Sequence, residues 1–141
     1  MAVDFEIHVD IAASPARVWS VMSDIERWHE WTTTVRSIRR LDSGPLRVGA
    51  RARVRQPKLP PADWTVTALD EGRGFIWITR SPGVTVVANH LVAPAGDGAH
   101  ATLSVRFIGV LAPLVAWMTE GLNRRYLGIE AAGLKRRAEN P

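Results

Sequence analysis

The sequence contains no cysteine among its 141 residues, which excludes disulfide bonds and thiolate metal ligands. It also lacks a run of about 18 uncharged apolar residues, the length that a membrane-spanning helix requires. Asp4, Glu6 and Asp10 stand where a signal peptide would need a basic segment and an unbroken apolar run. We therefore expect a cytoplasmic protein without cross-links or a membrane span.

Lysine is scarce, since only Lys58 and Lys135 stand among 18 basic residues, and the formal net charge is +4. A basic surplus can indicate nucleic-acid binding. Here the arginines are spread along the chain, and the densest cluster, 135–137, ends a predicted helix, where cations interact favourably with the helix dipole. We expect no nucleic-acid partner.

Common catalytic and cofactor motifs are missing as well. There is no G-x-S-x-G, H-E-x-x-H, P-loop or G-x-G-x-x-G pattern. The four histidines fall on separate predicted elements, which disfavours a metal site. We therefore expect neither a metal nor a cofactor.

Periodicity in the first third of the chain predicts a strand followed by two short helices. Apolar and polar residues alternate strictly over 3–11, as in a half-buried strand. Ser14 and Pro15 then have the pattern of an N-cap followed by proline at the first helical position. A second short helix over about 24–31 would place Trp28 and Trp31 on one face, where they could plug one end of a cavity.

Strand signals dominate the middle of the chain, and a helix is predicted at its end. Turn residues divide the middle into six strands joined by short links, hence antiparallel, near 35–42, 48–56, 63–70, 74–80, 84–93 and 100–108. From Pro113 to about Ala138 the pattern favours one long helix. Its expected inner face consists of Val115, Met118, Leu122, Tyr126, Ile129 and Gly133. Residues 1–141 therefore predict a single α+β domain.

Alternation within the strands separates an inner face from an outer face. The arginines of 48–56, Arg51, Arg53 and Arg55, share the outer face. The expected inner positions are Ala50, Ala52, Val54 and Gln56, then Trp64, Val66 and Ala68, then Phe75 and Trp77, then Val86, Ala88, His90 and Val92, and finally Leu103, Val105 and Phe107. The small row Ala50–Val54 fits a cavity better than a filled core.

An ordered set of short motifs resembles the polyketide cyclase/dehydrase branch of the START-related (SRPBCC) superfamily, which includes birch-pollen-allergen-like proteins. These motifs are Ser14-Pro15-Ala16-Arg17-Val18-Trp19, Asp24…Trp28…Trp31, Val48-Gly49, Gln56-Pro57-Lys58-Leu59-Pro60, Trp64, Pro82-Gly83-Val84, His90, Gly96-Asp97-Gly98 and Tyr126…Glu130…Leu134-Lys135-Arg136-Arg137. The resemblance implies a helix-grip fold, in which a seven-stranded curved antiparallel sheet wraps around the long C-terminal helix, with two short helices between the first and second strands. It also implies a deep cavity for an apolar or aromatic ligand.

We expect that cavity to lie between the sheet and the C-terminal helix. Its expected wall residues are Ala52, Val54, Gln56, Trp64, Trp77, His90, Phe107, Trp117, Met118, Leu122 and Tyr126.

Three functions remain open. We favour a non-catalytic protein that binds or carries a small hydrophobic ligand, because the expected wall is apolar with few polar groups. The alternative is a polyketide cyclase or dehydratase in which His90 acts as general acid or base. Against this alternative stands the interpretation that we favour for His90, a core residue satisfied by a neighbour or water. The third is a protein-interaction module, which would need an exposed apolar patch. Both a monomer and a homodimer fit the sequence.

Overall fold

The computed structural model describes residues 2–141, which form a seven-stranded antiparallel sheet with helices on one face. The strands are β1 (Ala2–Ile11), β2 (Ser37–Arg40), β3 (Arg51–Arg55), β4 (Ala62–Asp70), β5 (Gly74–Ser81), β6 (Val84–Ala95) and β7 (Gly98–Ile108). The helices are α1 (Pro15–Ser23), the 3-10 helix η1 (Ile25–Glu30), α2 (Ala112–Met118) and α3 (Glu120–Glu139).

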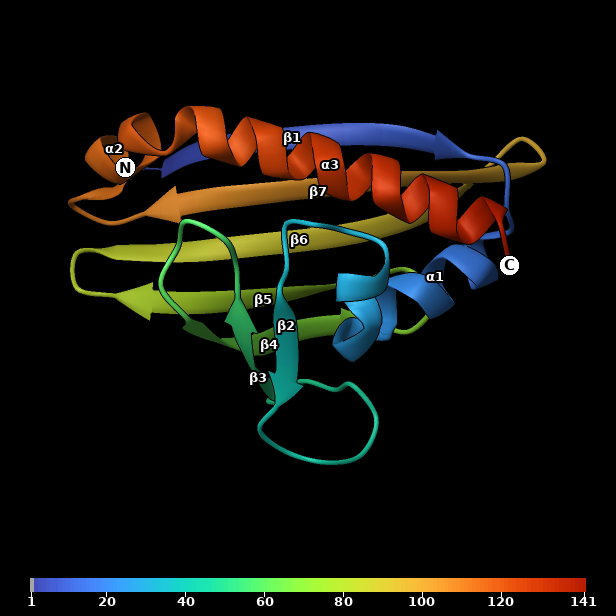
Figure 1. Cartoon of the computed structure of the whole chain (residues 1–141), viewed down its shortest axis with the longest axis horizontal. Coiled ribbons are helices and arrows are strands. Elements are labelled where there is room, and N and C mark those ends of the chain that lie inside the picture. Colours follow the sequence, from blue (N-terminus) through green and yellow to red (C-terminus); the bar gives the residue numbers. More distant parts are fainter. Residues whose placement is uncertain (1) are drawn as a thin grey trace.

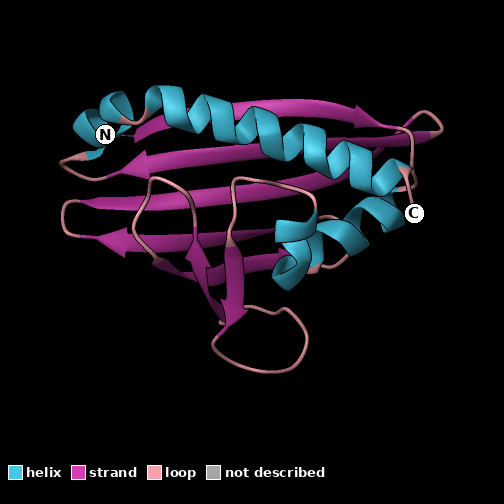
Figure 2. Ribbon diagram, viewed as in Figure 1, coloured by secondary structure: helices cyan, strands magenta, loops and turns pink. Residues whose placement is uncertain are grey.

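The strand order is β1-β7-β6-β5-β4-β3-β2, so the first strand pairs with the last. Figure 1 shows α3 running along the curved sheet, with α1 and η1 near its C-terminal end and α2 at the opposite end. Figure 2 shows the same separation of helices and strands by colour. The predicted α+β helix-grip architecture is confirmed.

The predicted start of the first helix is confirmed in detail. The Ser14 side chain accepts a hydrogen bond from the backbone N–H of Arg17 at 3.1 Å, and Pro15 occupies the first helical position. This bond satisfies one of the backbone donors that a helix leaves open at its N-terminus. α1 then buries Val18 and Met22 against the sheet and α3.

One inner-face assignment is wrong because the register of β4 changes. Val66 is buried and pairs with Trp77 of β5, but an irregularity follows, so Ala68 pairs with Ile76 and is exposed. Leu69 packs against the core instead. A bulge inserts one residue, and side chains beyond it therefore change faces.

The C-terminal helix is not continuous. Helix α2 ends at Met118 and α3 begins at Glu120. Between them, the Thr119 hydroxyl donates a hydrogen bond to the Val115 carbonyl at 2.7 Å. Threonine hydroxyls that bond to the carbonyl four residues earlier often bend a helix, which accounts for the interruption.

The two helices meet the sheet through small residues. Their buried positions include Ala112, Ala116, Ala131 and Ala138, which let the helix backbone approach the strands closely. Gly133 is buried as predicted, and a Cβ there would overlap the Trp31 carbonyl oxygen. Of the apolar residues on the predicted face, Val115 packs against the core and Leu122 and Ile129 are half-buried, but Met118 is exposed.

Candidate functional site

A cavity of about 300 Å³ lies between the sheet and the N-terminal half of α3. Strands β3 to β7, η1, the loop between β3 and β4, and both C-terminal helices contribute to its wall. Of the wall residues expected from the sequence, seven line this cavity: Val54, Gln56, Trp64, Trp77, His90, Phe107 and Tyr126. Their role in ligand binding stays a prediction.

The sheet side of the cavity is aromatic. Trp64 and Trp77 lie on adjacent strands with ring centroids 5.5 Å apart, and the Trp28 ring from η1 lies 5.6 Å from Trp77. Phe107 of β7 lines the cavity as well and packs edge-on against Phe5. Such rings offer large, rigid apolar surfaces on which a flat ligand can stack.

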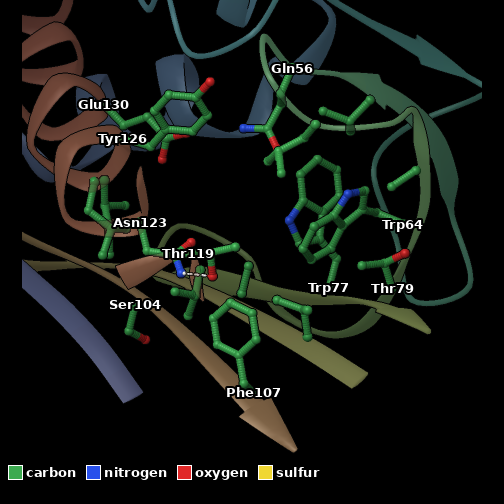
Figure 3. A pocket seen from close by; sticks show the side chains of 18 of the residues that line it. Gln56, Trp64, Trp77, Thr79, Ser104, Phe107, Thr119, Asn123, Tyr126 and Glu130 are labelled. Carbon is green, nitrogen blue, oxygen red and sulfur yellow. Dashed lines mark hydrogen bonds between the residues drawn. The ribbon is translucent and has the colours of Figure 1, made fainter. Parts of the chain in front are cut away.

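The helix side of the cavity carries a row of polar side chains beside Val115 and Leu127. Thr119, Asn123, Tyr126 and Glu130 recur at spacings of four, three and four, which places them on one helical face. In Figure 3 the residues of this face lie across the cavity from Trp64 and Trp77. The Asn123 amide donates to the Thr119 hydroxyl at 2.9 Å.

The Tyr126 hydroxyl connects α3 to the loop between β3 and β4. It donates a hydrogen bond to the Pro57 carbonyl. This bond ties α3 to the loop, which supplies Leu59 and Pro60 to the cavity wall. The hydroxyl hydrogen is committed to Pro57, so the phenolic oxygen can still accept a hydrogen bond.

Glu130 is the one carboxylic acid in the cavity wall of residues 2–141. The Thr34 hydroxyl donates to Glu130 Oε1 at 2.8 Å, and the buried Thr32 hydroxyl lies 2.9 Å from that of Thr34. Burial raises the pKa of Glu130 to about 7, although the bond from Thr34 favours the ionised form. At neutral pH this carboxyl is therefore poised between its two protonation states.

His90 packs among aromatic rings. It stacks on Phe75 with centroids 4.4 Å apart, and Trp28 and Trp77 flank it at 5.2 and 5.9 Å. Burial lowers the pKa of His90 to about 4, and a hydrogen bond with the backbone of Phe75 offsets part of this effect. The imidazole is therefore neutral at pH 7, and its Nδ1 has no partner among the described residues.

Four expected wall residues do not line the cavity. Ala52 is buried in the core, where its short side chain pairs across the strands with Trp64, whose indole reaches the cavity instead. Leu122 is half-buried outside the wall, and Trp117 and Met118 are 77% and 69% exposed. The helices bury a different set of positions, which consists of Ala112, Ala116, Leu127, Ala131, Gly133, Leu134 and Ala138, and the three large side chains lie outside it.

Glu130 was not among the wall residues expected from the sequence. Glu130 follows Tyr126 by four residues and Asn123 by seven, so all three share a helical face. That spacing is visible in the sequence. A helical glutamate is usually solvated, however, and only the position of α3 shows which face meets the cavity.

The predicted helix-grip architecture and this cavity together define a START-related protein with a ligand-sized interior. The family model described as "Polyketide cyclase / dehydrase and lipid transport" matches residues 2–139. The chain belongs to this family. No curated protein matches the sequence.

Several solved structures share the fold at low sequence identity. The Zhui aromatase/cyclase from Streptomyces sp. R1128 has a TM-score of 0.80 at 16% identity, covering 99% of this chain and 94% of that one. Norcoclaurine synthase from Thalictrum flavum has a TM-score of 0.77 at 15% identity, covering 100% and 88%. Ara h 8.0201 has a TM-score of 0.75 at 17% identity, covering 99% and 100%. These likenesses establish the fold.

Two further observations concern other classes of site. Within residues 2–141, no group of three or more histidine, aspartate or glutamate side chains is placed to hold a metal ion. In the same part of the chain, the helices are too short or too polar for one of them to reach across a bilayer.

Proposed function

We propose that the protein binds a small, largely apolar ligand with an aromatic ring in the cavity between the sheet and α3. The observation that carries this proposal is the cavity itself: about 300 Å³, walled by three tryptophans and a phenylalanine on one side and by a few polar groups on the other. Ligand sites commonly have this composition, and this volume lies at the lower end of their range. Membership of a family that includes lipid transport supports the same function.

Native mass spectrometry and tryptophan fluorescence titration with naphthalene derivatives test this proposal. Trp64 and Trp77 line the cavity, so a bound aromatic should change their emission. Ala88→Phe adds a ring to the cavity wall and should abolish binding while the circular dichroism spectrum stays unchanged. Ala68→Phe, on an exposed position of β4, is the matched control. Failure of every apolar compound to bind below about 100 μM, or about −5.5 kcal/mol, would overturn the proposal.

A second candidate function is catalysis of the cyclase or dehydratase type. Glu130 favours it, because an acid with a pKa of about 7 can both accept and donate a proton near neutral pH. His90, the group expected from the sequence, is neutral at pH 7 and remains the other candidate. Two of the proteins with a similar fold, the aromatase/cyclase and norcoclaurine synthase, have names of enzymes.

This second function can be tested with a linear poly-β-ketone generated in situ, with products resolved by mass spectrometry. Catalysis predicts a changed product ratio with the wild-type protein. Glu130→Gln or His90→Ala should abolish that change without lowering the melting temperature by more than a few degrees. The same product ratio with and without the wild-type protein would exclude the reaction for this substrate.

Three predictions from the sequence accompany these proposals. They are the cytoplasmic location, the absence of a nucleic-acid partner, and an oligomeric state of one or two chains. Sedimentation analysis and cell fractionation are the direct measurements.

A further inference from the structure

Two hydrogen-bond acceptors on adjacent turns of α3 line the cavity and can accept further donors. Glu130 Oε1 accepts from Thr34, but no donor of residues 2–141 reaches Glu130 Oε2. The Tyr126 oxygen, whose hydrogen goes to Pro57, has lone pairs to offer. In Figure 3 both Tyr126 and Glu130 lie on the helix side of the cavity.

No cationic side chain of the described chain neutralises Glu130 within the cavity. The wall contains neither lysine nor arginine, and its other titratable groups are Tyr126 and the neutral His90. The basic residues that follow Glu130 on α3 are engaged elsewhere: Lys135 pairs with Glu139 at 2.7 Å, Arg137 pairs with Glu30 at 2.5 Å, and Arg136 donates to the Trp31 carbonyl. The inner face of β1, packed against α3, supplies Phe5 and other apolar side chains.

We propose that Glu130 and Tyr126 bind the protonated amine of an aromatic ligand, whose ring lies against Trp64 and Trp77. An ammonium group has three donors and no acceptor, which suits these two oxygens. Its charge would supply the counterion that the buried carboxylate lacks, and charge-assisted hydrogen bonds are stronger than neutral ones. This inference rests on the proposed function, because it names the ligand class of the same cavity.

The proposal predicts that amine affinity depends on pH. The carboxyl must be ionised to bind an ammonium ion, and the raised pKa of Glu130 leaves it mostly protonated at pH 6 and mostly ionised at pH 8. Affinity for an amine that stays protonated over this range should therefore rise about tenfold from pH 6 to pH 8. Titration of His90 lies below this window.

Binding of naphthylmethylamine, naphthylmethanol and methylnaphthalene to the wild-type protein tests the proposal. All three present the same ring, but the first carries a cation and the second a neutral donor. We expect the amine to bind at least tenfold more tightly than methylnaphthalene at pH 8, and Glu130→Gln to remove this advantage. Glu120→Gln alters an exposed carboxylate at the start of the same helix and should retain it.

The possible results separate the two proposals. If methylnaphthalene and the amine both fail to bind, the proposed function fails. If methylnaphthalene binds but the amine shows no advantage that depends on Glu130, the function stands and the amine site is overturned. If naphthylmethanol matches the amine at pH 8, the site recognises a hydroxyl donor and the ammonium proposal is likewise overturned.

A separate apolar surface lies on α2, outside the cavity. Val110, Leu111, Leu114, Trp117 and Met118 are between 43% and 89% exposed. Leu114, Trp117 and Met118 share one face of α2 through their spacings of three and four, opposite the buried Ala112 and Ala116, and Val110 and Leu111 directly precede the helix. We call these five residues the α2 patch.

Three arginines lie near the α2 patch along the chain or beside the turn that contacts it. Arg124 and Arg125 follow on the first turns of α3, and Arg80 precedes the turn in which Gly83 accepts a hydrogen bond from Leu111 at 2.9 Å. Glu120, whose carboxylate lies 3.9 Å from Arg124, is the acidic residue between them. The three arginines and the one glutamate together carry a net positive charge.

From this combination we infer that the α2 patch docks on the surface of an anionic lipid bilayer. An amphipathic helix with an exposed tryptophan and flanking cations has the composition of an interfacial membrane anchor. Helix α2 also supplies Val115 to the cavity wall, and Thr119 follows it there. Docking through α2 would therefore place this end of the cavity near the membrane, from which an apolar ligand could enter.

Cosedimentation with vesicles of phosphatidylcholine, with and without phosphatidylglycerol, tests this second inference. Binding to the mixed vesicles should exceed binding to the neutral ones about tenfold and fall at high salt. Trp117→Ser should weaken it, whereas Val48→Ser, at another exposed apolar position, should not. Equal binding of Trp117→Ser and wild type, no binding to anionic vesicles, or a dimer in solution that Trp117→Ser dissociates would overturn the inference.

Discussion

Replacing Glu130 by glutamine should change how the stability of the protein depends on pH. The pKa of Glu130 rises from 4.5 to about 7 on folding because the carboxyl is buried. Between these values the folded chain retains a proton that the unfolded chain has released. Unfolding then releases a proton, so this group makes the free energy of unfolding fall as pH rises through the window.

The magnitude follows from the size of the shift. Each pKa unit corresponds to about 1.4 kcal/mol, so a fully buried carboxyl would cost about 3 kcal/mol above pH 7. Glu130 is partly accessible because it faces the cavity, and water there reduces the cost to about 2 kcal/mol. Glutamine keeps the shape and the acceptor for Thr34 but cannot ionise. The Glu130→Gln variant should therefore match the wild type at pH 4.5 and exceed it by about 2 kcal/mol at pH 8.

Because His90 also titrates, the effect of Glu130 must be measured as the difference in stability between Glu130→Gln and wild type. Its pKa falls from 6.5 to about 4 on folding, so the unfolded chain binds the extra proton between these values. The His90 contribution to stability is therefore lost as pH falls from 6.5 to 4, the opposite direction to Glu130. In the wild type the two effects offset each other between about pH 4.5 and 6.5. The Glu130 effect is isolated only in the difference between the unfolding free energies of Glu130→Gln and wild type.

Urea unfolding followed by the fluorescence of the six tryptophans measures this difference at pH 4.5, 6, 7 and 8. The exposed Glu120→Gln variant provides the control. A difference between Glu130→Gln and wild type that stays constant within about 0.5 kcal/mol over this range would refute the assignment of Glu130 as a buried carboxyl with a raised pKa.

Three further predictions concern the packing around the cavity. Gly133→Ala should destabilise the protein by about 1 to 3 kcal/mol, because the added Cβ meets the Trp31 carbonyl. Gly128→Ala on the same helix, with open space around it, should instead raise the free energy of unfolding by up to about 1 kcal/mol. Equal melting temperatures of the two variants would contradict this contrast. Ser14→Ala should cost about 1 kcal/mol through loss of the cap on α1, and Ser14→Asp should restore it in the same thermal assay. Tyr126→Phe should remove the bond to Pro57 and speed hydrogen exchange at residues 58–59; unchanged exchange there would show that the bond does not hold the loop.

The strand framework could be predicted from the sequence because its signals are local. Alternation over 3–11 predicted the faces of β1, and the same rule placed His90 and Phe107 on the inner face, where both are buried. Ser14 and Pro15 predicted the start of α1. Each of these features depends on neighbouring residues or on the two-residue period of a strand, so one chain suffices to predict them.

The errors arise where a local pattern does not decide the outcome. Ala68 was assigned inward, but the bulge in β4 depends on how β4 pairs with β5. Trp117 and Met118 were assigned to the cavity because large apolar residues usually face a core. The helices instead bury Ala112, Ala116, Leu127, Ala131 and Leu134, and Trp117 and Met118 point to solvent.

The sequence by itself determined the order of elements, the α+β class and the faces of most strands, because hydrophobic periodicity and turn chemistry act over a few residues. Only the tertiary structure decided which face of α3 meets the cavity. That face depends on contacts such as Gly133 with Trp31, which are distant in sequence. The same rotation buries Glu130 beside Thr34, and burial, which no local pattern reports, gives this carboxyl its raised pKa.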